Sequence, residues 1–111
     1  MGKNILVFAN DACSKVVKMN TSICKIDFSG TKRWVLNEEL HRTDGPAIEY
    51  PSGTKQWYLN DKLHREDGPA IEYWDGKIKW CLNGILYNSI QDYCKALNMT
   101  EEEQLLFILR W

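Results

Sequence analysis

The sequence predicts a mainly β protein of the α+β class. We expect an antiparallel β-meander of about three 23-residue hairpin repeats in one elongated sheet, capped by two short C-terminal helices. Three observations predict this: a sequence repeat, an apolar period of two within each copy, and two helix-capping signatures after the last copy. A chain of 111 residues forms one domain with a modest core. We divide it into an N-terminal cap with a degenerate repeat (1–29), the repeats (30–88) and a helical cap (89–111).

The repeat emerges when the sequence is shifted by 23 residues, because five positions then match in three copies. The segment LHRTDGPAIEY, residues 40–50, also returns as LHREDGPAIEY, residues 63–73, with one residue changed. Such a period indicates supersecondary units that bury their apolar faces by stacking. The aligned glycine and tryptophan residues, which we assign to the repeat core, are Gly30, Gly53, Gly76, Trp34, Trp57 and Trp80.

Each copy contains two segments with the alternation of half-buried strands. In TKQWYLN (54–60) and in PAIEY (69–73), apolar side chains alternate with polar ones, so that one face of each strand is buried. A two-stranded piece of this size cannot bury its Trp alone. Stacking of the copies therefore predicts a ladder of three Trp rings, each of which buries roughly 150–250 Å².

Turn signals separate the predicted strands. The residue pairs 37–38, 60–61 and 83–84 each begin with Asn, which tolerates the positive φ that a two-residue hairpin turn requires. The sequences PSG at 51–53 and WDG at 74–76 predict turns into the next copy. Each copy should therefore fold as an antiparallel hairpin.

The C-terminal segment changes to helical signals. Ser89 followed by Asp92, and Thr100 followed by Glu103, have the spacing of helix N-caps and capping boxes. The apolar segment QLLFILRW (104–111) has too few polar positions for a free surface helix, so we expect it to pack on the sheet or on another chain. Two short helices would cover the last repeat, whose open edge would otherwise recruit other strands.

The first 25 residues are less informative. NILVFAN (4–10) is compatible with a strand, and ACSKVVKM (12–19) with a short helix or a second strand. We leave these alternatives open.

The charge pattern argues against nucleic-acid and membrane partners. The net charge is −1, but residues 37–75 carry four Lys or Arg against nine Asp or Glu, whereas residues 1–36 carry six against two. An acidic central segment would repel nucleic acid and anionic headgroups. Direct nucleic-acid binding and membrane association are therefore not expected.

The cysteine spacing and the apolar runs predict a cytoplasmic protein. The four cysteines form no C-x-x-C pair and have no nearby histidine couple, which favours free thiols over a metal site or disulfides. The longest N-terminal apolar run, residues 5–9, is too short for a signal or membrane segment. We expect no metal and no cofactor.

The unit G-x-x-x-W-x-L-N-x-x-L-H-R-x-D-G-P-A-I-E-Y resembles the MORN-like repeat, a β-hairpin unit, in the variant with an H-R-x-D-G-P-A corner that is found in small bacteriophage accessory proteins and in some bacterial proteins. The resemblance covers residues 30–86. It implies an elongated series of hairpins that offers a binding surface, and it implies no catalytic residues. It also implies the host cytoplasm during infection as the working context.

The His-Arg-x-Asp corner has three interpretations. As a structural turn, Asp44 and Asp67 would accept backbone N–H groups or pair with Arg42 and Arg65. As a recognition surface, the same arginines would contact a partner. As a catalytic dyad, His41 or His64 would act beside an Asp, but a dyad gives no reason for a second copy 23 residues away. We favour the structural interpretation and assign no catalytic residue.

Several side chains are candidates for partner binding. Aromatic and arginine side chains are common interface anchors, and outward carboxylates at regular spacing can imitate a phosphate backbone. The candidates are Arg42, Arg65, Tyr58, Trp74, Glu66 and Glu72.

These observations lead to a non-enzymatic protein-interaction module, phage-encoded, that modulates or inhibits a host defence or metabolic protein, or binds a viral protein. The alternative is an acidic nucleic-acid mimic that blocks a nuclease or another DNA- or RNA-binding enzyme. An enzyme that uses His41 or His64 is the third hypothesis. The sequence leaves open whether the chain forms a homodimer through its sheet edge or its C-terminal tail.

Overall fold

The structure is a computed structural model that describes residues 21–111. The expected strand at 4–10 and the expected helix or strand at 12–19 lie outside the described residues. None of the helices within 21–111 has the length and apolar character needed to cross a membrane.

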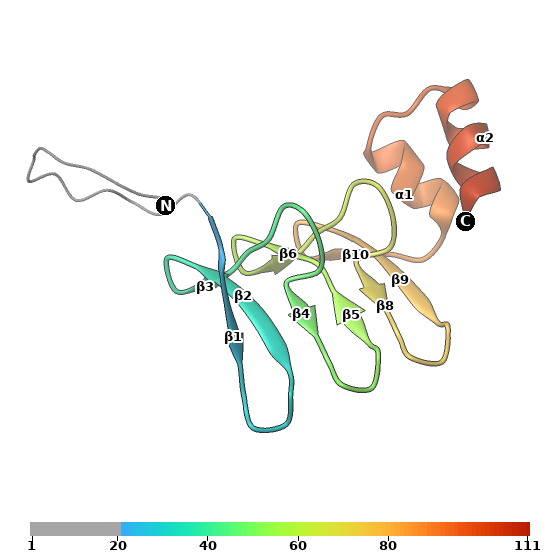
Figure 1. Cartoon of the computed structure of the whole chain (residues 1–111). Helices are drawn as coiled ribbons and strands as arrows, with labels where there is room; N and C mark the ends of the chain where they lie inside the picture. The colour runs from blue at the N-terminus through green and yellow to red at the C-terminus, as the bar shows by residue number, and fades with distance from the viewer. Residues whose placement is uncertain (1–20) are drawn as a thin grey trace, which may run out of the picture.

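The described chain is mainly antiparallel β-sheet with two helices at its C-terminal end, which confirms the α+β class (Figure 1). The helices are α1 (Ile90–Ala96) and α2 (Glu101–Arg110). The strands are β1 (Ile23–Ile26), β2 (Lys32–Leu36), β3 (Glu39–Leu40), β4 (Ile48–Glu49), β5 (Lys55–Gln56), β6 (Tyr58–Leu59), β7 (Lys62–Leu63), β8 (Ile71–Glu72), β9 (Ile78–Leu82) and β10 (Ile85–Tyr87).

The strands form two sheets where one was expected. Eight strands form the larger sheet in the order β1-β2-β4-β5-β8-β9-β10, with β3 paired to β2, and β6 pairs with β7 alone. The separation falls at Trp57, where β5 ends and β6 begins. Before Trp57 the strand pairs with β4 and β8, and after it the strand pairs with β7. The equivalent strand β2 runs through Trp34 without a break, so β3 stays in the larger sheet. A hydrogen bond from Asp61 N–H to Leu40 O, 2.9 Å long, still ties the small sheet to β3.

Two-residue turns occupy the positions that the Asn residues predict. Asn37, Asn60 and Asn83 each have φ of 50°, and the residue that follows each of them also has positive φ. Only the third turn has glycine at that second position; the first two place Glu38 and Asp61 there, with φ of 68° and 67°. The backbone of Glu38 and Asp61 therefore adopts the left-handed conformation, which residues other than glycine rarely adopt.

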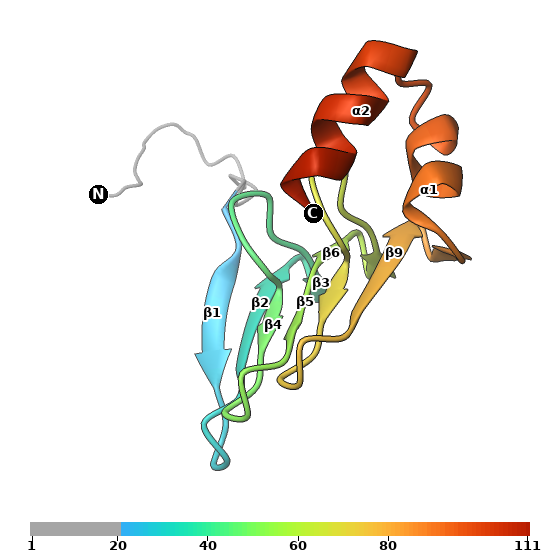
Figure 2. The ribbon, with the colours of Figure 1, turned by 90° about the vertical axis from the view of Figure 1, so that its right-hand side faces the viewer.

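Both helices begin where their caps predict. The Ser89 hydroxyl accepts a hydrogen bond from Asp92 N–H, and Thr100 forms a full capping box with Glu103. The helices lie at the β9–β10 end of the larger sheet (Figures 1 and 2). The main core is at this end, not at the middle of the sheet, and its buried residues are Trp80, Leu82, Tyr93, Cys94 and Phe107.

Candidate binding groove

The two corners, residues 41–46 and 64–69, are each organised around an arginine. Arg42 Nε donates to Asp44 Oδ1 at 2.9 Å, and Nη1 donates to Pro46 O at 3.0 Å and to Glu49 Oε2 at 3.3 Å. The Arg42 guanidinium also lies 3.8 Å from the centroid of the Trp34 ring. One side chain thus closes its own loop, reaches the following strand and covers the preceding Trp.

The second corner has the same set of contacts. Arg65 Nε donates to Asp67 Oδ1 at 2.9 Å, and Nη1 donates to Pro69 O at 3.1 Å and to Glu72 Oε2 at 2.8 Å. Its guanidinium lies 4.0 Å from the centroid of the Trp57 ring. Charge-assisted bonds of this length, combined with a cation–π contact, make each arginine a structural clamp.

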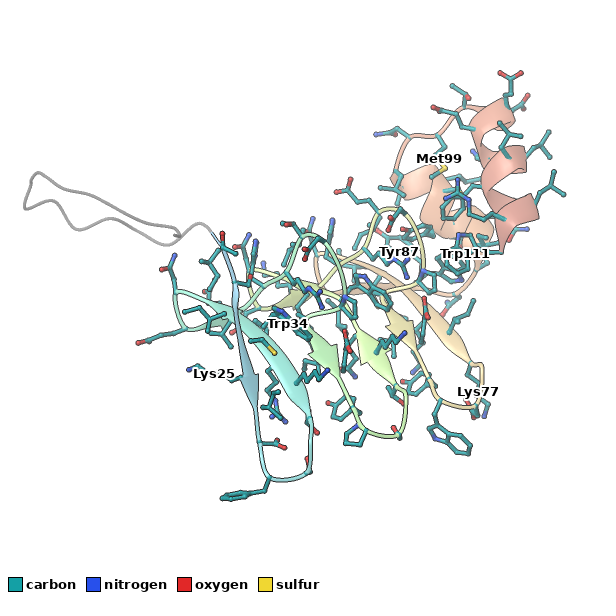
Figure 3. The ribbon with its side chains drawn as sticks, in the orientation of Figure 1. Lys25, Trp34, Lys77, Tyr87, Met99 and Trp111 are labelled. Carbon is teal, nitrogen blue, oxygen red and sulfur yellow. The ribbon has the colours of Figure 1, made fainter. Side chains whose placement is uncertain are left out.

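This arrangement differs from the expected Trp ladder. Trp34 and Trp57 are only half-buried and are covered by arginines, whereas Trp80 is buried among the rings of Tyr93, Phe107 and Trp111. A guanidinium is flat and stacks on an aromatic face, so it replaces the neighbouring ring that a ladder would require. Figure 3 shows Trp34 on the sheet and Trp111 beside the helices, near opposite ends of the row of strands.

The corner glycines allow the arginines to approach. A Cβ on Gly45 would lie 2.8 Å from Arg42 Cζ, and one on Gly68 would lie 2.7 Å from Arg65 Cζ. Only glycine accommodates that distance without displacing the guanidinium. The repeat-core residues Gly30, Gly53 and Gly76 differ, because they have φ of 91–103° at the tight turns between copies.

Both histidines support the neighbouring turn. His41 Nδ1 accepts Asn60 N–H at 3.0 Å, and His64 Nδ1 accepts Asn83 N–H at 2.9 Å. A ring whose Nδ1 accepts carries its proton on Nε2, and His64 Nε2 lies 2.8 Å from Glu66 Oε2. Neither imidazole has its Nδ1 lone pair free for proton abstraction.

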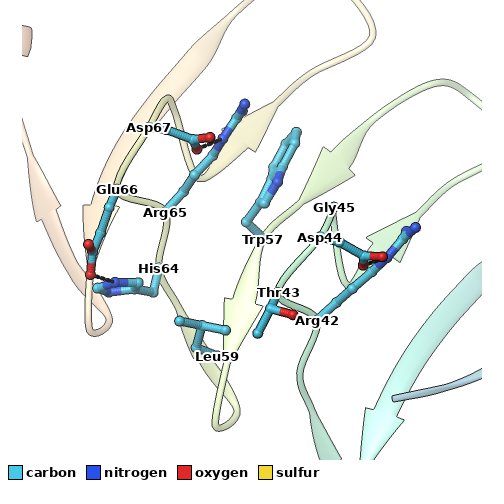
Figure 4. A pocket seen from close by; sticks show the side chains of 10 residues that line it. All are labelled: Arg42, Thr43, Asp44, Gly45, Trp57, Leu59, His64, Arg65, Glu66 and Asp67. Carbon is cyan, nitrogen blue, oxygen red and sulfur yellow. Dashed lines mark hydrogen bonds and ion pairs between the residues drawn. The ribbon is translucent and has the colours of Figure 1, made fainter. Parts of the chain in front are cut away.

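A groove of 630 Å³ lies between the two corners, with Trp57 and Leu59 between its walls (Figure 4). In Figure 4 the Trp57 ring stands between the two Arg–Asp pairs. One side chain on each wall is the residue that differs between the two corner sequences, Thr43 and Glu66, and both are exposed. We call this space the Trp57 groove; it is lined by Arg42, Thr43, Asp44, Gly45, Trp57, Leu59, His64, Arg65, Glu66 and Asp67.

Three of the six predicted partner-binding residues meet in the Trp57 groove, namely Arg42, Arg65 and Glu66. The two arginines are 20% and 15% exposed and hold internal contacts, so they form walls rather than free anchors. The other three lie elsewhere. Glu72 binds Arg65, and the Tyr58 side chain is half-buried beside Gln56.

The sixth candidate, Trp74, is 71% exposed and lines a separate hollow of 580 Å³ together with Tyr73 and Ile78. This hollow lies at the tight turn between β8 and β9, at the opposite ends of the strands from the corners (Figures 1 and 3). The structure therefore does not join Trp74 to the arginines in one surface.

The Trp34 position has a smaller groove of 250 Å³, lined by Trp34, His41, Arg42, Thr43 and Asp44 together with Thr21 and Ser22. Residues 42–44 of the first corner line both this groove and the Trp57 groove.

The sequence did not reveal the roles of Thr43, Gly45 and Leu59 in the groove. The one residue that differs between the two corner sequences was the available signal for Thr43.

Comparison with known proteins adds no assignment: no protein-family model, no curated protein and no solved structure matches the chain. The similarity to MORN-like repeats stays a prediction. Among residues 21–111, no three His, Cys, Asp or Glu side chains are grouped so that they could hold a metal ion.

Proposed function

We propose that the protein is a non-enzymatic protein-interaction module and that the Trp57 groove is its binding site. The proposal includes the finer fold interpretation, in which about three 23-residue MORN-like hairpin repeats place successive corners along one edge. The corner motif supports a phage-encoded protein that acts on a host or viral protein in the host cytoplasm. Modulation or inhibition of that protein is the role we propose.

The groove carries the proposal because it combines volume with the composition of a binding site. Its 630 Å³ falls within the roughly 300–1,000 Å³ that ligand sites occupy. Trp57 and Leu59 provide apolar surface, and the walls provide the exposed carboxylates of Asp44 and Asp67. An aromatic ring in a partly covered pocket is the usual centre of a protein interface.

The geometry favours this function over the nucleic-acid mimic. A mimic requires carboxylates that present net negative charge at regular spacing. Here Asp44, Asp67 and Glu72 each pair with an arginine. This pairing cancels much of the negative electrostatic potential that a basic cleft would recognise. Binding to a mimic would weaken steeply with salt, whereas binding in the Trp57 groove should tolerate it.

The test uses a variant that fills the groove. Thr43→Trp places an indole on an exposed position in the groove wall. Ser52→Trp places the same side chain on the exposed turn between β4 and β5, at the other ends of the strands from the corners. Parent and variants are used to capture proteins from bacterial lysate, and each captured protein is then titrated in purified form. We expect a partner that binds the parent and Ser52→Trp equally and loses at least tenfold in affinity for Thr43→Trp.

Two results would contradict the proposal. One is a set of purified partners that bind Thr43→Trp as tightly as they bind the parent. The other is a partner whose binding falls with salt and with charge reversal at Glu66 and Glu72, which would support the mimic instead. Circular dichroism of both variants must match the parent, so that a loss of binding reports on the two grooves that Thr43 lines and not on misfolding. Glu66→Trp fills the Trp57 groove alone, because Glu66 does not line the smaller groove at Trp34, and it should also weaken binding.

A further inference from the structure

The place over Trp80 that corresponds to the Trp57 groove is filled by the chain itself. Tyr93 from α1 has its ring centroid 4.8 Å from that of Trp80, at an interplanar angle of 44°. Phe107 from α2 and Trp111 complete the cover, at 5.8 and 6.0 Å. Tyr93 is fully buried there, so the space over a repeat Trp can hold a tyrosine side chain.

The Tyr93 hydroxyl has two acceptors, and both belong to the second corner. It donates to Arg65 O and lies 3.0 Å from Gly68 O. The corner backbone therefore holds two carbonyl oxygens that converge on one phenol. Because the aromatic ring of Tyr93 contacts Trp80 at the same time, the corner and the Trp together recognise both ends of a tyrosine side chain.

The first corner carries the same groups 23 residues earlier. Arg42 and Gly45 correspond to Arg65 and Gly68, and Trp57 corresponds to Trp80. Arg42, Gly45 and Trp57 all line the Trp57 groove. Among the hydrogen bonds within residues 21–111, none ends on Arg42 O or on Gly45 O.

We infer that the Trp57 groove binds a tyrosine side chain of a protein partner. The ring packs beside Trp57, and the hydroxyl donates to the carbonyl oxygens of Arg42 and Gly45, as Tyr93 does one repeat later. This inference rests on the proposed function and names the ligand of that site. A phenylalanine would fill the same space but would leave both carbonyls without a donor.

The charges at the groove argue against a phosphorylated tyrosine. Its acceptors are carbonyl oxygens, which repel a phosphate, and the exposed carboxylates of Asp44, Glu66 and Asp67 stand on the walls. The arginines that could pair with phosphate are already bound to those aspartates and to Glu49 and Glu72. The ligand is therefore a neutral phenol.

The test titrates N-acetyl-tyrosine amide into the isotope-labelled protein. We expect a Kd of roughly 0.3–1 mM, which is the affinity that a ligand of this size ordinarily reaches. The resonances that should move are the Trp57 indole N–H and the Thr43 amide, which shares a peptide group with Arg42 O. N-acetyl-phenylalanine amide should bind about threefold to tenfold more weakly, which corresponds to one neutral hydrogen bond.

Matched variants separate this inference from the proposed function. Thr43→Trp should abolish the shifts at Trp57, whereas Ser52→Trp should keep them. Equal affinity for the tyrosine and phenylalanine amides, tighter binding of the phosphotyrosine amide, or no shift at Trp57 would each overturn the inference. If the amides fail while a captured partner still depends on Thr43, the inference falls and the proposed function stands. If the tyrosine amide binds but no partner depends on Thr43, the tyrosine subsite stands and the proposed function falls.

Discussion

Replacement of Tyr93 by phenylalanine isolates the contribution of one buried hydroxyl. The ring keeps its position against Trp80 and Phe107, because the substitution removes a single oxygen and opens no cavity of methyl size. What changes is the partner of two carbonyl oxygens, Arg65 O and Gly68 O, which both lie against the Tyr93 hydroxyl. The variant thus measures how strongly the helical cap is fixed to the second corner.

The expected loss follows from the burial of these groups. Tyr93 is 0% exposed and Gly68 is buried, so water cannot replace the hydroxyl. A buried acceptor that loses its donor costs about 1–3 kcal/mol in unfolding free energy. In a domain of this size that corresponds to a fall in Tm of roughly 4–8 °C for each kcal/mol.

The loss should also depend on pH. Burial is the main cause that raises the pKa of Tyr93 above its ordinary value of about 10. A raised folded pKa means that ionisation favours the unfolded chain, so the stability is complete below about pH 10 and declines above it. The phenylalanine variant lacks this titration. The stability difference between parent and variant should therefore be largest near neutral pH and should narrow above pH 10.

The assay is urea unfolding followed by tryptophan fluorescence, with equal m-values required for comparison. Tyr87→Phe is the matched control, because Tyr87 packs against the same core and its hydroxyl has no hydrogen bond within residues 21–111. The control should change stability by less than about 0.5 kcal/mol. A Tyr93→Phe variant as stable as this control, or a difference that does not narrow above pH 10, would refute the reasoning.

Three further predictions concern the turn, the corner and the thiols. Glu38→Gly should raise the unfolding free energy by about 1 kcal/mol in urea unfolding, because it relieves a φ of 68°; a decrease would contradict the strain. Gly45→Ala should lower it by about 1–3 kcal/mol through the clash with Arg42, and the same change made in an Arg42→Ala background should have a smaller effect, which a double-mutant cycle measures. Cys24 should react with a thiol reagent in the folded protein, whereas Cys94, which is fully buried and has a raised pKa, should react only after unfolding; mass spectrometry of the labelled peptides decides this.

The local elements were predictable because their signals are local. The capping pair Thr100–Glu103 and the Asn residues at the turns act within a few residues, and the structure places helices and positive φ at those positions. The period of two also located the strands. These features need no knowledge of which segments meet in space.

The contacts that build the groove were not predictable, because they depend on tertiary partners. Period and composition place Trp34 on a buried face, but they do not say whether a ring or a guanidinium covers it. The glycine at position 45 does not reveal from the sequence that the Arg42 guanidinium lies against it. Likewise, the helical period places Tyr93 on a buried face, but its acceptors lie 25 and 28 residues earlier in the sequence.

The two corners have nearly the same sequence but different surroundings. Where the helices fold back, the second corner and Trp80 are closed by Tyr93, and that end becomes the hydrophobic core. Where no helix follows, the first corner and Trp57 keep the same backbone groups around an open groove. The single substitution between the corners, Thr43 against Glu66, lies on the walls of this groove and makes them chemically different without disturbing either arginine clamp. Under the proposed function, the same corner sequence closes the fold at one position and forms a binding site at the other, and the difference between them is the presence of the chain's own tyrosine.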